Sequence, residues 1–183
     1  ILPELDRGLQ RLWACDCVER ALPLFDEAFP GDGRLVEALA AARGYAQGTL
    51  DAVALEEAWE AARDASSGDT VMGMRAAEAA GDIPQRRRMG RASDVASAAM
   101  AAADPPSSWD SDFLHAAHSA EDALVGFDLA LDSPEFQAIS SSEGLMGLRG
   151  SSLPDRTAVP TEPGRLAERC WQRQRLAELL EGG

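Results

Sequence analysis

Apolar residues recur every three to four positions along most of this chain, and this spacing is what most constrains its fold. Such spacing places the apolar side chains on one face of a helix, as it does between residues 5 and 25. The chain shows no run with the alternating, β-branched pattern of a strand, because Ile, Val and Thr are scattered among Ala and Glu. The sequence therefore predicts an all-α fold.

Turn and cap residues divide this pattern into separate helices. Pro23 lacks a backbone donor and is expected to interrupt the first helix near its last turn. Asp32 and Asp51 are expected to cap the next two helices. A Ser-Ser-Gly turn at 66–68 is expected to close the second of these. Further helices are predicted at 70–80, 84–103, 111–132 and 164–181, with a short one around 143–148.

The 183 residues are enough for one domain with a sizeable core. We expect a single antiparallel bundle of about six to eight helices. Residues 1–132 would form the main bundle, and 164–181 a C-terminal helix that docks onto it. Gly, Pro and Ser residues between them predict a long irregular connection at 133–163.

The charge of the chain is strongly acidic. It has 31 acidic and 17 basic residues, every basic residue is Arg, and the net charge is −14. This balance disfavours binding to nucleic acid or to an anionic membrane, whereas a basic protein partner is compatible with it. Residues 1–65 and 105–160 carry most of the acidic excess, and the neutral part between them contains the dense basic cluster at 86–91.

The lack of a recognisable targeting signal and the pattern of the cysteines lead us to expect a cytoplasmic protein. No stretch approaches the roughly 18–20 apolar residues of a membrane span, and the first residues lack the basic and apolar parts of a signal peptide. The three cysteines, Cys15, Cys17 and Cys170, are an odd number, and the first two are only two positions apart on a helix. We interpret them as reduced thiols rather than as a disulfide framework.

Three segments, two of them near the ends of the chain, carry a family resemblance. Residues 13–25 read Trp-Ala-Cys-Asp-Cys-Val-Glu-Arg-Ala-Leu-Pro-Leu-Phe, 43–48 read Arg-Gly-Tyr-Ala-Gln-Gly, and 168–176 contain Trp-Gln-Arg. These segments resemble the bacterial Imm-5-like family of immunity proteins, which are small, Ala-rich and helical. The resemblance covers about a third of the chain, and 66–150 follow the family pattern only loosely. It implies a helical protein that neutralises a toxin by binding it, and it brings no catalytic residues.

The two histidines of the chain suggest one candidate chemical site. His115 and His118 are three positions apart, and Asp122 follows four positions later, so all three can project from one helix face. This face could supply three ligands to a metal, or catalytic groups, but a bundle site needs further ligands from another helix. A solvated polar face is the commoner outcome, and we predict no metal and no cofactor.

Four arginines form a candidate anion-binding cluster. Arg86, Arg87, Arg88 and Arg91 could clamp a phosphate or a carboxylate, because guanidinium groups form paired hydrogen bonds with such anions. The alternative is a structural role at the start of a helix. The pairs of Asp16 with Arg20, and of Glu168 with Gln172, are interpreted as ordinary helix-surface pairs.

Two places combine aromatic and acidic residues and are candidate partner-binding sites. Glu56, Trp59 and Glu60 lie on an acidic helix face, and Trp109, Asp110 and Asp112 lie where a loop enters a helix. An aromatic anchor surrounded by charge is typical of a tight protein interface. The alternative for Trp59 is a core position beside an ordinary solvated face.

These observations favour a non-enzymatic immunity-type protein that binds a basic toxin through its acidic surfaces. The alternative is a small-molecule-binding or catalytic bundle of bacterial specialised metabolism, which would use His115, His118 and the arginines of 86–91. A third interpretation is a scaffold that associates with itself through its Ala-rich faces. The sequence does not predict an oligomeric state or identify the toxin.

Overall fold

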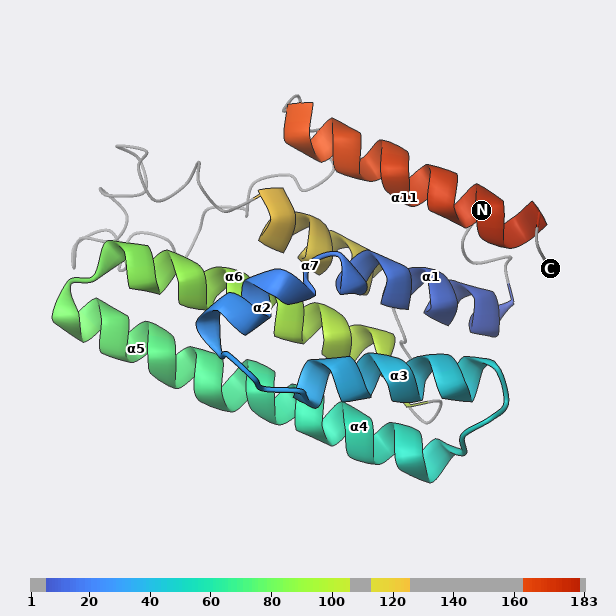
Figure 1. Cartoon of the computed structure of the whole chain (residues 1–183), viewed down its shortest axis with the longest axis horizontal. Helices are drawn as coiled ribbons and strands as arrows, with labels where there is room; N and C mark the ends of the chain where they lie inside the picture. Colours follow the sequence, from blue (N-terminus) through green and yellow to red (C-terminus); the bar gives the residue numbers. More distant parts are fainter. Residues whose placement is uncertain (1–5, 106–112, 126–162, 182–183) are drawn as a thin grey trace, which may run out of the picture.

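The computed structural model describes residues 6–105, 113–125 and 163–181. Every regular element in these ranges is helical, which confirms the all-α prediction. Figure 1 shows their arrangement, with helices α1 (Arg7–Glu19), α2 (Leu22–Ala28), α3 (Arg34–Ala46), α4 (Ala52–Asp64), α5 (Thr70–Ala80), α6 (Ile83–Ala102), α7 (Phe113–Val125) and α11 (Pro163–Glu181). In the part of the chain described, no helix is both long and apolar enough to cross a bilayer.

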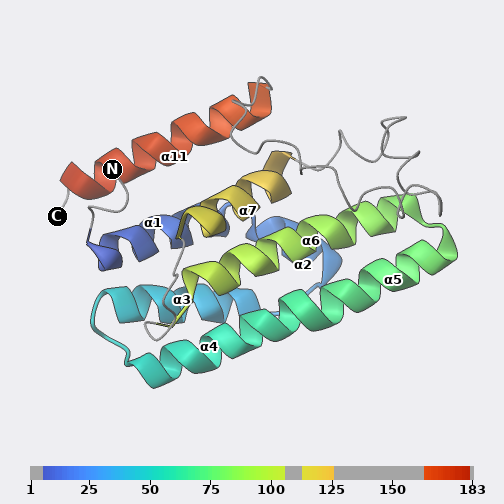
Figure 2. The ribbon, with the colours of Figure 1, turned by 180° about the vertical axis from the view of Figure 1, so that it is seen from behind.

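Helix α6 lies at the centre of the bundle. It contacts α7 and each of the five helices that precede it, and Figure 2 shows it between α7 and α5. Its buried residues are mainly alanines, whose small side chains let the neighbouring helices approach closely. The large buried side chains come from the surrounding helices and include Phe25, Leu35, Leu39 and Leu55. The core is thus formed by large residues packed around an Ala-rich central helix.

Aspartates lie near the start of two predicted helices, and only Asp51 occupies the cap position that the sequence predicts, since Gly33 rather than Asp32 is the cap residue of α3. Asp51 accepts a hydrogen bond from the Ala54 amide at 3.0 Å and caps α4, as predicted. Asp32 lies one position before Gly33, the cap residue of α3, and accepts from the Arg34 amide at 3.1 Å. Both carboxylates satisfy an amide that the first helical turn leaves without a partner.

Pro23 separates α1 from α2, as the sequence predicted. The break falls at Arg20 and Ala21, and Pro23 lies in the first turn of α2. A missing amide is tolerated there, because the first turn has no internal partner for it. The chain is therefore helical again as far as Ala28.

The predicted stop at 66–68 is wrong. Residues Ala65–Asp69 form a π-helical turn that joins α4 directly to α5. The Ser67 hydroxyl donates to the Arg63 carbonyl at 2.8 Å, and the Thr70 hydroxyl donates to the Ser66 carbonyl. These hydroxyls bond the helix's own carbonyls, so the widened turn continues the helix instead of ending it.

The C-terminal helix lies along α1 and α7 at the outside of the bundle (Figures 1 and 2). Its bounds, Pro163–Glu181, agree with the predicted 164–181. Helix α7 agrees with the middle of the predicted 111–132 helix. The rest of that helix, nearly all of the 133–163 connection and the short helix at 143–148 lie outside the described residues.

Candidate functional site

The first and last segments of the family resemblance, 13–25 and 168–176, meet in the structure. The Trp13 indole on α1 donates a hydrogen bond to the Gln172 carbonyl on α11 at 2.9 Å. The Arg20 guanidinium lies over the Trp171 ring, 4.1 Å from its centroid, and pairs with Glu168 at 3.1 Å. These residues of the two motifs hold the last helix against the first.

Further ion pairs connect α11 to the bundle. Glu121 of α7 is 1 % exposed and receives Arg165 at 3.4 Å and Arg169 at 3.1 Å. Asp16 of α1 receives Arg175 at 2.8 Å, and this hydrogen bond raises the pKa of Arg175, which keeps it charged. A buried carboxylate is stable only where such partners neutralise it. These acids therefore serve the fold.

This network corrects the surface pairs expected from the sequence. Asp16 pairs with Arg43 of α3 at 2.8 Å and with Arg175, rather than with Arg20 one turn away. Glu168 accepts from Gln172 at 3.4 Å, as spacing suggests, but also pairs with Arg20 across the α1–α11 interface. Both carboxylates belong to contacts between helices.

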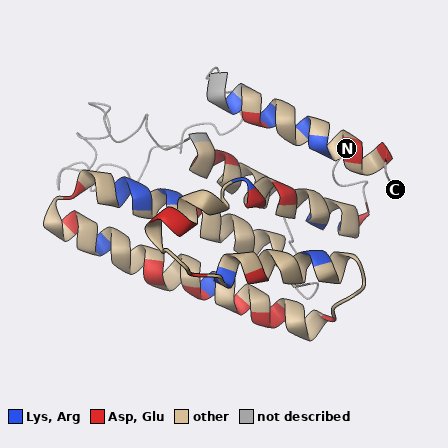
Figure 3. Cartoon of the chain, viewed as in Figure 1, with Lys and Arg blue, Asp and Glu red and all other residues tan. Residues whose placement is uncertain are grey.

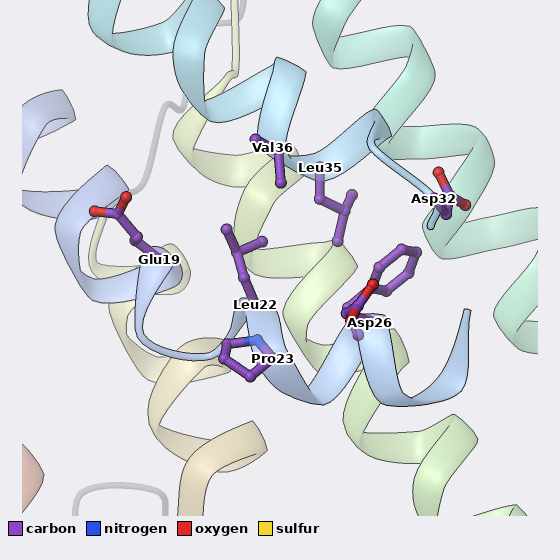
Figure 4. Close-up of a pocket in the computed structure, with 8 residues that line it drawn as sticks. Glu19, Leu22, Pro23, Asp26, Asp32, Leu35 and Val36 are labelled. Carbon is purple, nitrogen blue, oxygen red and sulfur yellow. The ribbon is translucent and has the colours of Figure 1, made fainter. Parts of the chain in front are cut away.

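A half-open hollow of about 350 Å³ lies between the α1–α2 corner and α3 (Figure 4). Apolar residues form its floor, and carboxylates lie at two sides. Glu19 lies on the α1 side, with Asp26 and Asp32 opposite it and Leu22 between them (Figure 4). The lining consists of Glu19, Leu22, Pro23, Phe25, Asp26, Asp32, Leu35 and Val36. Four of these residues belong to the first resemblance motif, although no sequence pattern predicted a hollow.

The three carboxylates of the hollow differ in how they are neutralised. Glu19 receives Arg43 at 2.6 Å, and Asp32 receives Arg34, whose hydrogen bonds lower the Asp32 pKa and keep that carboxylate ionised. Asp26 accepts the Gly31 amide at 3.1 Å and has no cationic partner among the described residues. Negative charge therefore exceeds positive charge around the apolar floor.

The acidic face predicted on α4 is present, and much of its charge is free of internal pairs. Glu56, Glu57 and Asp64 are exposed and have no ion pair within the described part of the chain. Glu60 pairs with Arg63, whose guanidinium lies 5.0 Å from the centroid of the Trp59 ring. Trp59 is half-buried and packs against the core. The acids beside Trp59 are therefore more accessible on this face of α4 than the indole itself.

The other aromatic and acidic candidate, Trp109 with Asp110 and Asp112, lies outside the described residues. The surface distribution of charge is otherwise clear in Figure 3. Acidic residues are concentrated on α2 and α4, and basic residues on the first turns of α6. Helix α11 carries both kinds of charge.

The structure does not gather the histidines into a ligand set. His115 and His118 are both exposed on α7, whereas Asp122 is 2.6 Å from Arg165 of α11. Among the described residues, no group of three or more His, Cys, Asp and Glu side chains is arranged to hold a metal ion.

The arginine cluster is half-buried along the start of α6. Arg88 pairs with Glu27 of α2 at 3.3 Å and donates to Gln85 at 3.2 Å. Arg86, Arg87 and Arg91 are half-buried on the same helix. Arg88 therefore links α6 to α2, and this contact is compatible with a structural role for the cluster.

The sequence analysis did not predict the environments of two charged side chains, Arg11 and Asp94. Arg11 is 5 % exposed, and it donates to the Ala102 and Asp104 carbonyls at 2.8 Å each. The signal for it was an arginine spaced with Cys15 on the buried face of α1. Asp94 on α6 has its pKa raised to about 7, because burial disfavours its charge and Asp122 repels it. Nothing in the local sequence pattern indicated this environment.

The protein is small and acidic, and every regular element of the described residues is helical. Residues 2–83 match the sequence model of the family described as Imm-5 like putative immunity protein. This match confirms the resemblance over the segment that contains the hollow and the acidic face of α4, and the Trp-Gln-Arg element of α11 lies beyond it. Searches of curated proteins and of solved structures found no match.

Proposed function

We propose that this protein is an immunity protein that binds a basic toxin and neutralises it by occupying the toxin's surface. One observation carries the proposal. Within the segment that matches the immunity family, α4 exposes several carboxylates that no internal arginine neutralises, among them Glu56 and Glu57. The buried acids Glu121 and Glu168 have arginine partners, whereas these exposed carboxylates are accessible to a partner protein.

Unpaired surface carboxylates suit the recognition of a basic protein. Their combined field increases the rate at which a cationic partner arrives, and each can pair with a partner's Arg or Lys once contact is made. The net charge of −14 adds to this field over the whole molecule. Glu56, Trp59 and Glu60 form the proposed contact on α4, and Trp109, Asp110 and Asp112 remain a second proposed contact.

Neutralisation by binding needs neither a catalytic group nor a cofactor. The proposal is therefore a one-to-one complex in the bacterial cytoplasm, weakened by salt, in which the acidic surface covers basic groups that the toxin needs. Salt weakens such complexes because the Debye length falls from about 10 Å at 0.1 M to about 3 Å at 1 M ionic strength.

The first test is affinity capture from a lysate of the native host at low and at high salt, followed by mass spectrometry. We expect the wild-type chain to retain one basic protein that high salt releases. The double variant Glu56→Arg, Glu60→Arg should lose it. The matched control is Glu178→Arg, which reverses an exposed acid on α11. Capture that is indifferent to salt and to the α4 reversal contradicts the proposal.

The second test measures protection. The captured protein is expressed in a neutral bacterial strain together with each variant, and growth is followed. Wild type and a His115→Ala, His118→Ala variant should both restore growth, while the α4 reversal should not. Loss of protection in the histidine variant, with protection retained by the α4 reversal, would favour the small-molecule alternative.

A further inference from the structure

The half-open hollow beside α2 is a small site with an apolar floor. Its volume of about 350 Å³ lies at the small end of the roughly 300–1,000 Å³ range of ligand pockets. Leu35 and Phe25 close its base and are fully or almost fully buried. Val36 lines the hollow and is 56 % exposed, so a bound group could cover it.

The charge around this apolar floor is incompletely balanced. Arg34 is shared between Asp32 and Asp69 and neutralises less than these two carboxylates require. Arg43 pairs with Glu19 and with Asp16, and Asp16 also receives Arg175. Asp26 has no cationic partner at all within the described residues. The opening thus lacks positive charge, although its carboxylates are held in place by internal hydrogen bonds.

An occupant must therefore combine an apolar stem with a cationic end. A long basic side chain does so, because its methylene groups cover apolar surface while its charge remains at the rim. Arginine fits better than lysine, since its guanidinium is more weakly hydrated and presents several donors in a plane to nearby carboxylates. Leu22 and Val36 would contact the stem, and Asp26 would receive the guanidinium.

We propose that this hollow binds an arginine side chain, which is the anchor residue of the basic partner. The inference rests on the proposed function for the identity of that partner. It adds the chemical group that is recognised and the place where it enters. It also gives Glu19, Leu22, Pro23 and Phe25 of the first motif a common location in one binding site.

The binding step can be tested without the partner. The whole chain, labelled with ¹⁵N, is titrated with N-acetyl-arginine amide and followed by amide chemical shifts in NMR spectra. N-acetyl-citrulline amide is the matched ligand control, because it has nearly the same shape and no charge. We expect saturable shifts at residues 19–36 with the arginine probe and none with citrulline. Equal responses to both probes, or shifts spread over α4, would overturn the inference.

Variants then test the proposed contacts. Asp26→Asn removes one charge and retains an oxygen for the Gly31 amide, so the fold should be preserved. It should weaken binding of the arginine probe at least about threefold, as expected for a partly exposed ion pair. Val36→Arg places a cation at the opening and should abolish the response. Glu37→Gln is the control, because it removes the same charge beside the hollow without lining it. An equal loss in Glu37→Gln contradicts specific binding in the hollow.

Capture from lysate separates this inference from the proposed function. If Val36→Arg loses the basic protein that the wild type retains, the hollow is its anchor site. If Val36→Arg retains that protein as well as the wild type does, the anchor inference fails while the immunity function stands. If the wild type captures no basic protein, the proposed function fails, and binding of the arginine probe still decides whether the hollow recognises arginine.

Discussion

At the residue scale, Arg11 shows how a buried charge can hold two distant segments together. Its guanidinium donates to the last carbonyls of α6 and of the segment after it, Ala102 and Asp104. It lies between two aromatic rings, 5.3 Å from the Tyr45 centroid and 5.1 Å from that of Phe113. Positive charge is favourable at this position, because the carbonyl end of a helix is the negative end of its dipole.

Replacing Arg11 with Met should therefore destabilise the protein strongly. Methionine fills the space between the rings, but two buried carbonyls lose their donors. We expect the free energy of unfolding, measured by urea titration, to fall by about 2–4 kcal/mol. Arg7→Met is the control, because Arg7 is exposed at the start of the same helix. If both substitutions lower the free energy of unfolding by the same small amount, the hydrogen bonds of Arg11 contribute little to stability.

Asp94 predicts a pH dependence of stability. Its pKa in the folded protein is about 7, above the ordinary 3.8, because of burial first and of Asp122 second. Folding therefore retains a proton that the unfolded chain has released, and stability is lost as the pH rises from about 4 through 7. Asp94→Asn removes this loss, since it cannot ionise.

Urea titration of both proteins across this pH range measures the effect. Each unit of pKa difference corresponds to about 1.4 kcal/mol, and local relaxation reduces the total. We expect Asp94→Asn to gain about 1–3 kcal/mol over wild type at pH 8 and almost nothing at pH 4. A stabilisation that is the same at both pH values would show that the charge of Asp94 is not its cause.

At the element scale, α11 is held by polar contacts together with Trp171, Leu176 and Leu179, which pack against the core. Its buried contacts with α1 and α7 centre on Glu168, Gln172 and the arginines that bind Glu121 and Asp16. Paired charges of this kind contribute less net stability than apolar packing of equal size, because each charge is taken out of water. The helix should thus open locally before the rest of the bundle unfolds.

Glu121→Gln tests this local stability. The substitution retains the side-chain volume but removes the charge that Arg165 and Arg169 share. Amide hydrogen exchange, read by mass spectrometry, should become faster in 163–181 by about tenfold or more, with little change in α3 to α6. Glu178→Gln is the control, because Glu178 pairs with Arg175 and Gln174 of its own helix. Equal acceleration by both variants would contradict docking through Glu121.

The success of sequence analysis also differs from element to element. The start of α4 after its cap Asp51 and the bounds of α6 were predicted within about one residue, since the cap, Ala and Pro signals on which they depend are local. The π-helical turn was not predicted, because serine hydroxyls can either end a helix or bond its carbonyls. The hollow and the partners of Asp16 depend on which helices become neighbours, and one-dimensional spacing contains no information on that.

At the scale of the whole molecule, the segment that matches the immunity family packs closely against α6. Residues 2–83 end at the first residue of α6, yet α6 contacts every one of the five helices before it. Without α6, the buried surfaces of Phe25, Leu35 and Leu55 would lose the helix at their centre. We therefore propose a single domain that needs the central helix to fold.

Truncation tests this dependence. A fragment of residues 1–83 should retain some helical circular dichroism but show no cooperative urea transition and poorly dispersed NMR signals. A fragment of residues 1–125 keeps α6 and α7 and should unfold cooperatively, at a lower urea concentration than the whole chain because α11 is missing. A cooperative transition in the shorter fragment would show that α1 to α5 form a core of their own. The acidic face and the hollow could then bind a partner without the central helix, and the single-domain proposal would be wrong.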